Sequence, residues 1–243
     1  MNTVWVIVRR ELQGYFSTPL AYIFIAVFLG LAGLLTFQVG MFYESRQAQL
    51  GAFFTWHPWL YLFLVPAISM RLWAEERKSG TIELLFTLPI SQGQAVAGKF
   101  LAGWLLLVLA LVLTFPMVLT VEALGSPDGG QILAGYLGSA MMAGAYLAIG
   151  CCMSALTRNQ VISFVLSVVV CFLFMLAGFP AVLEFISAGP AWLVDSVTAL
   201  SFLSHFDSVQ RGVIELRDLV FFASMALTWL YACSVVLEWN RAR

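Results

Sequence analysis

The sequence predicts an all-α integral membrane protein, and three observations lead to that prediction. Hydrophobic residues make up 61% of the 243 positions and charged residues only 10%, and the mean hydropathy is +0.93, values beyond those of soluble domains. The apolar runs are continuous over about 20 residues, the length that a helix needs to cross the hydrocarbon core. None of them alternates apolar and polar residues as the strands of an outer-membrane barrel do. Helices are therefore the expected membrane-crossing elements.

Six apolar segments are long enough to be predicted as transmembrane helices. Because they occupy almost the entire length, residues 1–243 are expected to form one transmembrane domain, with no internal repeat and no second domain. The spans are predicted at about 20–42, 55–74, 95–121, 132–155, 160–180 and 218–239.

The segment at 2–17 is predicted to be an amphipathic helix that lies in the membrane interface. Wound as a helix, it places Val8 and Leu12 on one side and Arg9 and Arg10 on the other, a pattern typical of interfacial helices. The alternative is that these residues are the frayed start of the first span. The arginines follow an apolar start, and the next apolar run is longer than a signal core, so the segment is not expected to be cleaved.

Lysines and arginines collect near the span ends that share one side of the membrane, which predicts that both termini are cytoplasmic. Acidic residues gather in the segments on the opposite side, and the net charge of −1 gives no sign of nucleic-acid binding. The cations expected inside are Arg9, Arg10, Arg71, Arg77, Lys78, Lys99, Arg158, Arg241 and Arg243, against Arg46, Arg211 and Arg217 outside.

A short charged segment, Glu75–Ser91, stands between two long apolar runs on the predicted cytoplasmic side. Ser79 or Thr81 can cap a helix start, Glu83 then lies in the positively polarised first turn, and Pro89 ends the helix. We therefore expect a short structured helix in this segment, at about 79–89.

An apolar face and a second helix start accompany this charged segment. Ile82, Leu85 and Phe86 share one face of the expected helix, while Ser91 and Gln94 have the spacing of a capping box that begins the next helix. The segment is thus either a structured contact surface for a partner or an ordinary solvated turn whose charges only fix orientation. The residues alone leave both interpretations open.

The charged segment resembles the signature of ABC-2 type transporter permeases. In that family the first cytoplasmic loop carries Glu-Glu-Arg-x-x-Gly-Thr-x-Glu-x-Leu followed by Leu-Pro-Ile-Ser, which here runs from Glu75 to Leu85 and from Leu88 to Ser91. The flanking phrases look most like the gliding-motility-associated permease branch, and more loosely like the permease of the nitrous-oxide-reductase maturation cluster. These phrases lie at Arg10–Tyr22, Met70–Ala74, Leu203–Phe206 and Arg211–Glu215.

The resemblance implies the membrane-spanning permease subunit of an ATP-driven transporter, an exporter, in the bacterial cytoplasmic (inner) membrane. It implies a separate ABC-type ATPase that binds ATP and Mg²⁺, a second permease copy as a homodimer or related pair, the lipid bilayer and an outer-facing accessory protein as partners. This chain is then not an enzyme and holds no catalytic, metal or cofactor residue. The ATPase-coupling residues would be Glu75, Glu76, Arg77, Gly80, Thr81, Ile82, Glu83, Leu85, Phe86 and Pro89.

Two rival functions remain at this point. One is a membrane scaffold that anchors an ATPase or motility complex without transport. The other is a secondary carrier or channel, which the lack of ionisable residues at the middle of any predicted span argues against.

Several local patterns are interpreted as structural. Residues 93–100 have the spacing of a phosphate-binding loop, but Phe100 stands where a hydroxyl must hold magnesium. Arg71 either pairs with Glu75 or extends to the headgroups. His57 and the four cysteines of the apolar spans are expected to be buried structural residues. His205 is also expected to be structural, and small residues such as Gly135, Ser139, Ala143 and Gly144 are expected to let helices pack closely.

The outer segment at about 181–217 is the longest break between spans and is too polar to cross the membrane. By resemblance to ABC-2 permeases it forms short outer helices that re-enter the membrane. A simple interfacial helix is the alternative.

Overall fold

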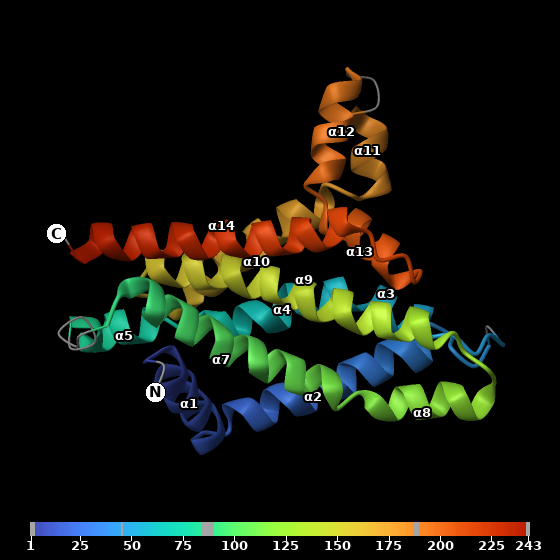
Figure 1. Ribbon diagram of the computed structural model, residues 1–243, viewed down its shortest axis with the longest axis horizontal. Helices are drawn as coiled ribbons and strands as arrows, with labels where there is room; N and C mark the ends of the chain where they lie inside the picture. The colour runs from blue at the N-terminus through green and yellow to red at the C-terminus, as the bar shows by residue number, and fades with distance from the viewer. Residues whose placement is uncertain (1–2, 45, 84–89, 187–189, 242–243) are drawn as a thin grey trace.

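The computed structural model describes residues 3–44, 46–83, 90–186 and 190–241, and these form helices and the segments that connect them, with no strand among them (Figure 1). Within these residues four helical segments are long and apolar enough to cross a membrane, and a bent pair, Gln160–Leu176 with Pro180–Ile186, would make a fifth. The all-helical class is confirmed, whereas the count of six spans is not. The four segments are Leu20–Val39, Gln92–Leu124, Gly129–Leu156 and Leu216–Trp239.

The chain begins with helix α1 (Thr3–Ser17), which covers nearly the whole range predicted for the amphipathic helix. Its buried residues, Ile7 and Val8, face the start of α7 (Gln92–Val112), where a Cβ on Gly98 would lie 2.7 Å from Ile7 Cγ2. Such a close approach requires glycine. Helix α1 is therefore docked on the bundle, and its place in a membrane interface stays a prediction.

The first span continues through α2 (Leu20–Leu34) into a π-helical turn, η1 (Leu35–Val39), and α3 (Gly51–Thr55) follows. The second predicted span, at about 55–74, is a shorter helix, α4 (His57–Ser69), of 13 residues. At 1.5 Å per residue it is about 20 Å long, less than the hydrocarbon thickness of about 30 Å.

Helix α4 ends at Ser69, and the chain then turns before α5 (Ala74–Ser79) begins. In that turn the backbone N–H groups of Trp73 and Ala74 donate to the Ser154 hydroxyl, at 3.0 Å each. The hydroxyl comes from a distant helix, so tertiary contact supplies the acceptor for these donors.

The third span bends between α7 and α8 (Phe115–Leu124). The predicted capping box at the start of α7 is confirmed, since Gln94 N donates to Ser91 Oγ at 3.2 Å and Ser91 N donates to Gln94 Oε1 at 3.1 Å.

Helix α9 (Gly129–Leu156) is the central helix of the bundle, with α7, α4, α10 (Gln160–Leu176) and α14 (Leu216–Arg241) packed around it (Figure 1). The expectation that its small residues serve packing is confirmed. A Cβ on Gly135 would meet the Phe54 ring at 2.4 Å, and one on Gly144 would lie 3.2 Å from Trp104 Nε1.

In the outer segment the structure describes three short helices, α11 (Pro180–Ile186), α12 (Ala191–Ala199) and α13 (Phe202–Gln210). Helix α11 turns 65° away from α10, and α11 and α12 project from the bundle while α13 lies against it (Figure 1). The start of α1 and the end of α14 lie toward the end of the bundle that also carries α5 (Figure 1). This arrangement agrees with termini on one side of a membrane.

Candidate functional site

Helix α5 begins the segment in which the sequence places the coupling residues. Glu75 and Glu76 lie in its first turn and Arg77 in its last, the charge order that the helix dipole favours. The helix ends at Gly80, whose φ of +74° lies in the left-handed region that glycine adopts without strain.

The rest of the predicted coupling helix is described only at its start. Residues 81–83 are helical, and the Glu83 side chain is exposed. Leu85, Phe86 and Pro89 fall outside the described residues, so their predicted part in a contact face is not tested.

Hydrogen bonds fasten α5 to the end of α9. The Ser154 hydroxyl accepts from the backbone N–H groups of Trp73 and Ala74 and donates to the Met70 carbonyl at 3.1 Å. Arg77 Nη1 donates to the Ala155 carbonyl, in the last turn of α9, where a cation is favoured. These contacts tie the turn before α5 and the last turn of α5 to the central helix of the bundle.

A buried lysine joins α5 to two further helices. Lys99 of α7 lies 2.8 Å from Glu76 Oε1 and 3.1 Å from Glu11 Oε1 of α1, with only 3% of its side chain exposed. Its ammonium also stands 5.2 Å above the Trp73 ring, a distance at which cation and ring attract. Arg10 completes the group, 2.7 Å from Glu11 and 3.8 Å from Glu76. We call Arg10, Glu11, Glu76 and Lys99 the charge cluster.

The charge cluster changes the titration of Glu11. Burial acts to raise the pKa of this carboxyl, but the Lys99 and Arg10 charges and their hydrogen bonds outweigh it, and the pKa of Glu11 lies below its usual value. Glu11 is therefore ionised at neutral pH. A buried ion without a partner costs free energy. Moving α1, α5 or α7 away from the charge cluster would leave such an ion, so the cluster holds the three helices together.

Arg71 and Glu75 form the pair that their spacing allows. Arg71 Nε and Nη2 donate to Glu75 Oε2 and Oε1 at 2.8 and 3.0 Å. These hydrogen bonds are the largest cause that holds the pKa of Glu75 below its usual value. The side chains are 35% and 48% exposed, so the pair contributes only about 0–1 kcal/mol. It links the turn that follows α4 to the first turn of α5.

Lys99 and Glu11 are functional candidates that the sequence interpretation missed, whereas Glu76 was among the predicted coupling residues. Their contacts join residues 88 positions apart, and no local spacing reveals such a pair. One signal was available, because a lysine inside an apolar run requires an ionic partner. The phosphate-loop spacing at 93–100 lies wholly inside α7, so helix packing and carboxylate binding account for Gly98 and Lys99.

The other end of the bundle holds a second buried polar pair. His205 Nδ1 of α13 lies 2.6 Å from Asp218 Oδ1 in the first turn of α14, and Nε2 lies 3.2 Å from the Ala199 carbonyl. The imidazole stacks on Phe221 at 4.0 Å between centroids. This network joins α12, α13 and α14, which fits the structural role expected for His205.

Other polar residues of the helices also have structural contacts. Ser139 Oγ lies 2.8 Å from His57 Nδ1 and 2.6 Å from the Tyr61 hydroxyl. The four cysteines are free and buried, with Cys151 Sγ and Cys233 Sγ 3.7 Å apart. The described residues contain no cluster of three or more His, Cys, Asp or Glu side chains able to hold a metal ion.

The fold is thus that of a multi-pass helical membrane protein whose charged segment is fixed to several spans. Residues 60–237, more than half of the chain, match the family described as ABC-2 family transporter protein. The chain belongs to this family of transporter permeases.

Curated relatives agree with that assignment. A probable ABC transporter permease protein NosY from Pseudomonas aeruginosa is 33% identical over 168 residues, which are 64% of this chain and 58% of the relative. The protein of the same name from Stutzerimonas stutzeri is 31% identical over 124 residues, 47% of this chain and 44% of the relative. The chain spans about half the length of these relatives. The gliding-motility branch suggested by the flanking phrases is not confirmed.

Proposed function

We propose that this chain is the membrane-spanning subunit of an ATP-driven ABC-2 exporter in a bacterial cytoplasmic membrane, with both termini in the cytoplasm. A separate ATPase binds ATP and Mg²⁺ and docks on residues 75–91, and a second permease copy completes the path. The family match and the names of the relatives support this proposal.

The observation that carries the proposal is the attachment of α5 to three other helices. Ser154 and Ala155 hold α5 to α9, and Lys99 holds it to α7. Glu11 of α1 binds the same lysine. A force applied beyond Gly80 therefore acts on spans and not on a free loop. An ordinary solvated turn has no need of a buried lysine or of hydrogen bonds to a central helix.

The site residues take different parts in this proposal. Glu76 and Arg77 anchor α5 to the spans, and Glu75 pairs with Arg71 at the start of α5. Gly80 provides the bend between α5 and the helical residues that begin at Thr81. The residues that meet the ATPase are Thr81, Ile82, Glu83, Leu85, Phe86 and Pro89.

Co-purification with the candidate ATPase tests the proposal. We compare the natural chain with a variant carrying Ile82→Ser, Leu85→Ser and Phe86→Ser, and with a control carrying Val161→Ser, Ile162→Ser and Val165→Ser on the exposed surface of α10. We expect the ATPase to bind the natural chain and the control, and to be lost or uncoupled in the first variant.

Absence of the ATPase from the natural chain would contradict the proposal. An ATPase that binds normally while no solute moves across proteoliposomes would instead show a scaffold.

A further inference from the structure

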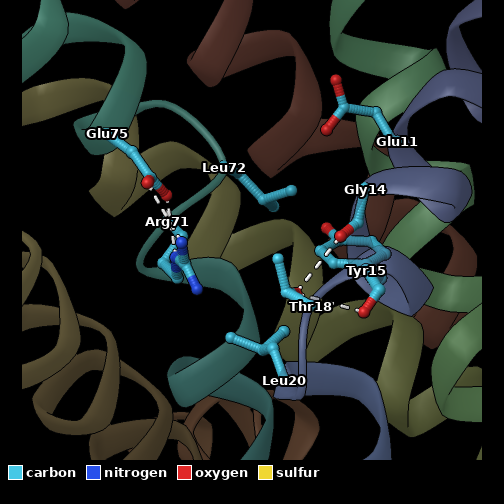
Figure 2. A pocket seen from close by; sticks show the side chains of 8 residues that line it. All are labelled: Glu11, Gly14, Tyr15, Thr18, Leu20, Arg71, Leu72 and Glu75. Atoms are coloured by element: carbon cyan, nitrogen blue, oxygen red, sulfur yellow. Dashed lines mark hydrogen bonds and ion pairs between the residues drawn. The ribbon is translucent and has the colours of Figure 1, made fainter.

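A pocket of about 180 Å³ lies between the end of α1, the start of α2 and the turn that follows α4. Figure 2 shows the Arg71–Glu75 pair on one wall and Tyr15 and Thr18 on the opposite wall. Pockets for drug-sized ligands measure roughly 300–1,000 Å³. This pocket is therefore of a size for a small polar molecule or for the polar end of a larger one.

The pocket contains donors without partners. The Tyr15 hydroxyl is buried and has no hydrogen-bond partner within the described part of the chain, a state that bound water or a ligand normally relieves. Arg71 uses Nε and Nη2 for Glu75, which leaves three of its five N–H donors for another acceptor.

A negatively charged acceptor, the Glu75 carboxylate, lies beside these donors. The two Glu75 oxygens each accept one bond from Arg71 and retain further lone pairs. Glu11 also lines the pocket, but its carboxylate is already paired with Arg10 and Lys99. Because the charges of Arg71 and Glu75 cancel, a ligand with both a negative and a positive group fits this pocket better than a plain anion.

The position of the pocket indicates where such a ligand would come from. Leu20, one of its lining residues, is the first residue of a candidate span, and Arg71 and Glu75 follow the end of α4. The pocket therefore lies where the apolar part of the bundle meets its charged end, which is the level of lipid headgroups. The exposed apolar side chains of Ile23 and Val27 continue along α2 from there, as acyl chains require.

We propose that this pocket binds the headgroup of phosphatidylethanolamine, with the phosphate at Tyr15 and Arg71 and the ammonium at Glu75. The lipid joins α1 to the turn before α5 and stabilises their relative position. The trimethylammonium of phosphatidylcholine has no N–H to donate to Glu75, and phosphatidylglycerol brings no cation. This binding does not depend on an ATPase partner.

Native mass spectrometry of the purified full chain tests the proposal, with equal amounts of the three lipids added in detergent. We expect phosphatidylethanolamine to be retained over the other two. Tyr15→Phe removes only the hydroxyl and should lower that retention about tenfold, the size expected for one hydrogen bond to a charged group. Tyr231→Phe, on the exposed side of α14, is the matched control and should behave as the natural chain. Arg71→Gln should remove the preference among lipids.

Two results would overturn the proposal. One is equal retention of the three lipids. The other is a Tyr15→Phe variant that binds as the natural chain does. A further arm adds inorganic phosphate in excess over the lipid: we expect no displacement, whereas loss of bound lipid would assign the pocket to free phosphate.

Discussion

The two ends of the bundle both bury ionisable side chains, but these side chains connect different parts of the chain. At the α5 end, Lys99 holds carboxylates from α1 and α5, and its hydrogen bond to Glu11 spans 88 residues. At the other end, His205 and Asp218 are 13 residues apart and join successive helices. The first arrangement links distant segments, so one side chain controls the position of several helices. The second fixes a local packing, so its loss should stay local.

Removing Lys99 is the change with the largest expected effect. Lys99→Met keeps much of the side-chain volume but leaves Glu11 and Glu76 without their buried cation, with only the more exposed Arg10 nearby. Breaking a buried ion pair in this way costs about 3–5 kcal/mol. We expect a clear drop in the thermal unfolding temperature of the purified chain.

A combined variant separates charge from packing. Lys99→Met with Glu11→Gln and Glu76→Gln removes the two carboxylates that have lost their buried cation, so most of the lost stability should return. If Lys99→Met alone unfolds at the natural temperature, the charge cluster does not hold the three helices together.

Substitution at the opposite end should have a smaller and more local effect. His205→Phe keeps a ring to stack on Phe221 but leaves Asp218 buried without its partner, at a cost of about 1–3 kcal/mol. We expect faster hydrogen exchange in α12, α13 and the start of α14, measured by mass spectrometry. Equal loosening of α1 and α5 would show that the two ends are not independent.

Acid should weaken the α5 end only at low pH. The pKa values of Glu11 and Glu75 are lowered in the folded chain, so their contribution to stability is present above the unfolded value of about 4.3. It is lost as the pH falls through the lower folded values. We expect no loss of stability from these groups between about pH 8 and 5 and a loss below about pH 4, followed by thermal unfolding. Glu75→Gln should reduce the acid-dependent part, while a decline that starts above about pH 6 would contradict this account.

The sequence was informative where local chemistry decides the structure. The apolar runs predicted a helical membrane protein, Ser91 and Gln94 predicted the start of α7, and the small residues of α9 predicted close packing. The second span was predicted at about 55–74 because hydropathy measures only composition. Hydropathy does not reveal the turn that follows α4, whose backbone N–H groups are bound by a hydroxyl of α9. The same reason explains why Lys99 was missed, since its carboxylate partners come from separate helices.

The most direct test of the central claim is a charge reversal on the exposed face just beyond Gly80. Glu83→Lys is compared with Glu122→Lys, an exposed substitution on α8, by measuring transport-coupled ATP hydrolysis of the purified complex in proteoliposomes. We expect both variants to insert and fold normally, with coupled hydrolysis lowered only in Glu83→Lys. Normal coupling in Glu83→Lys would contradict the assignment of this segment as the link between the ATPase and the spans.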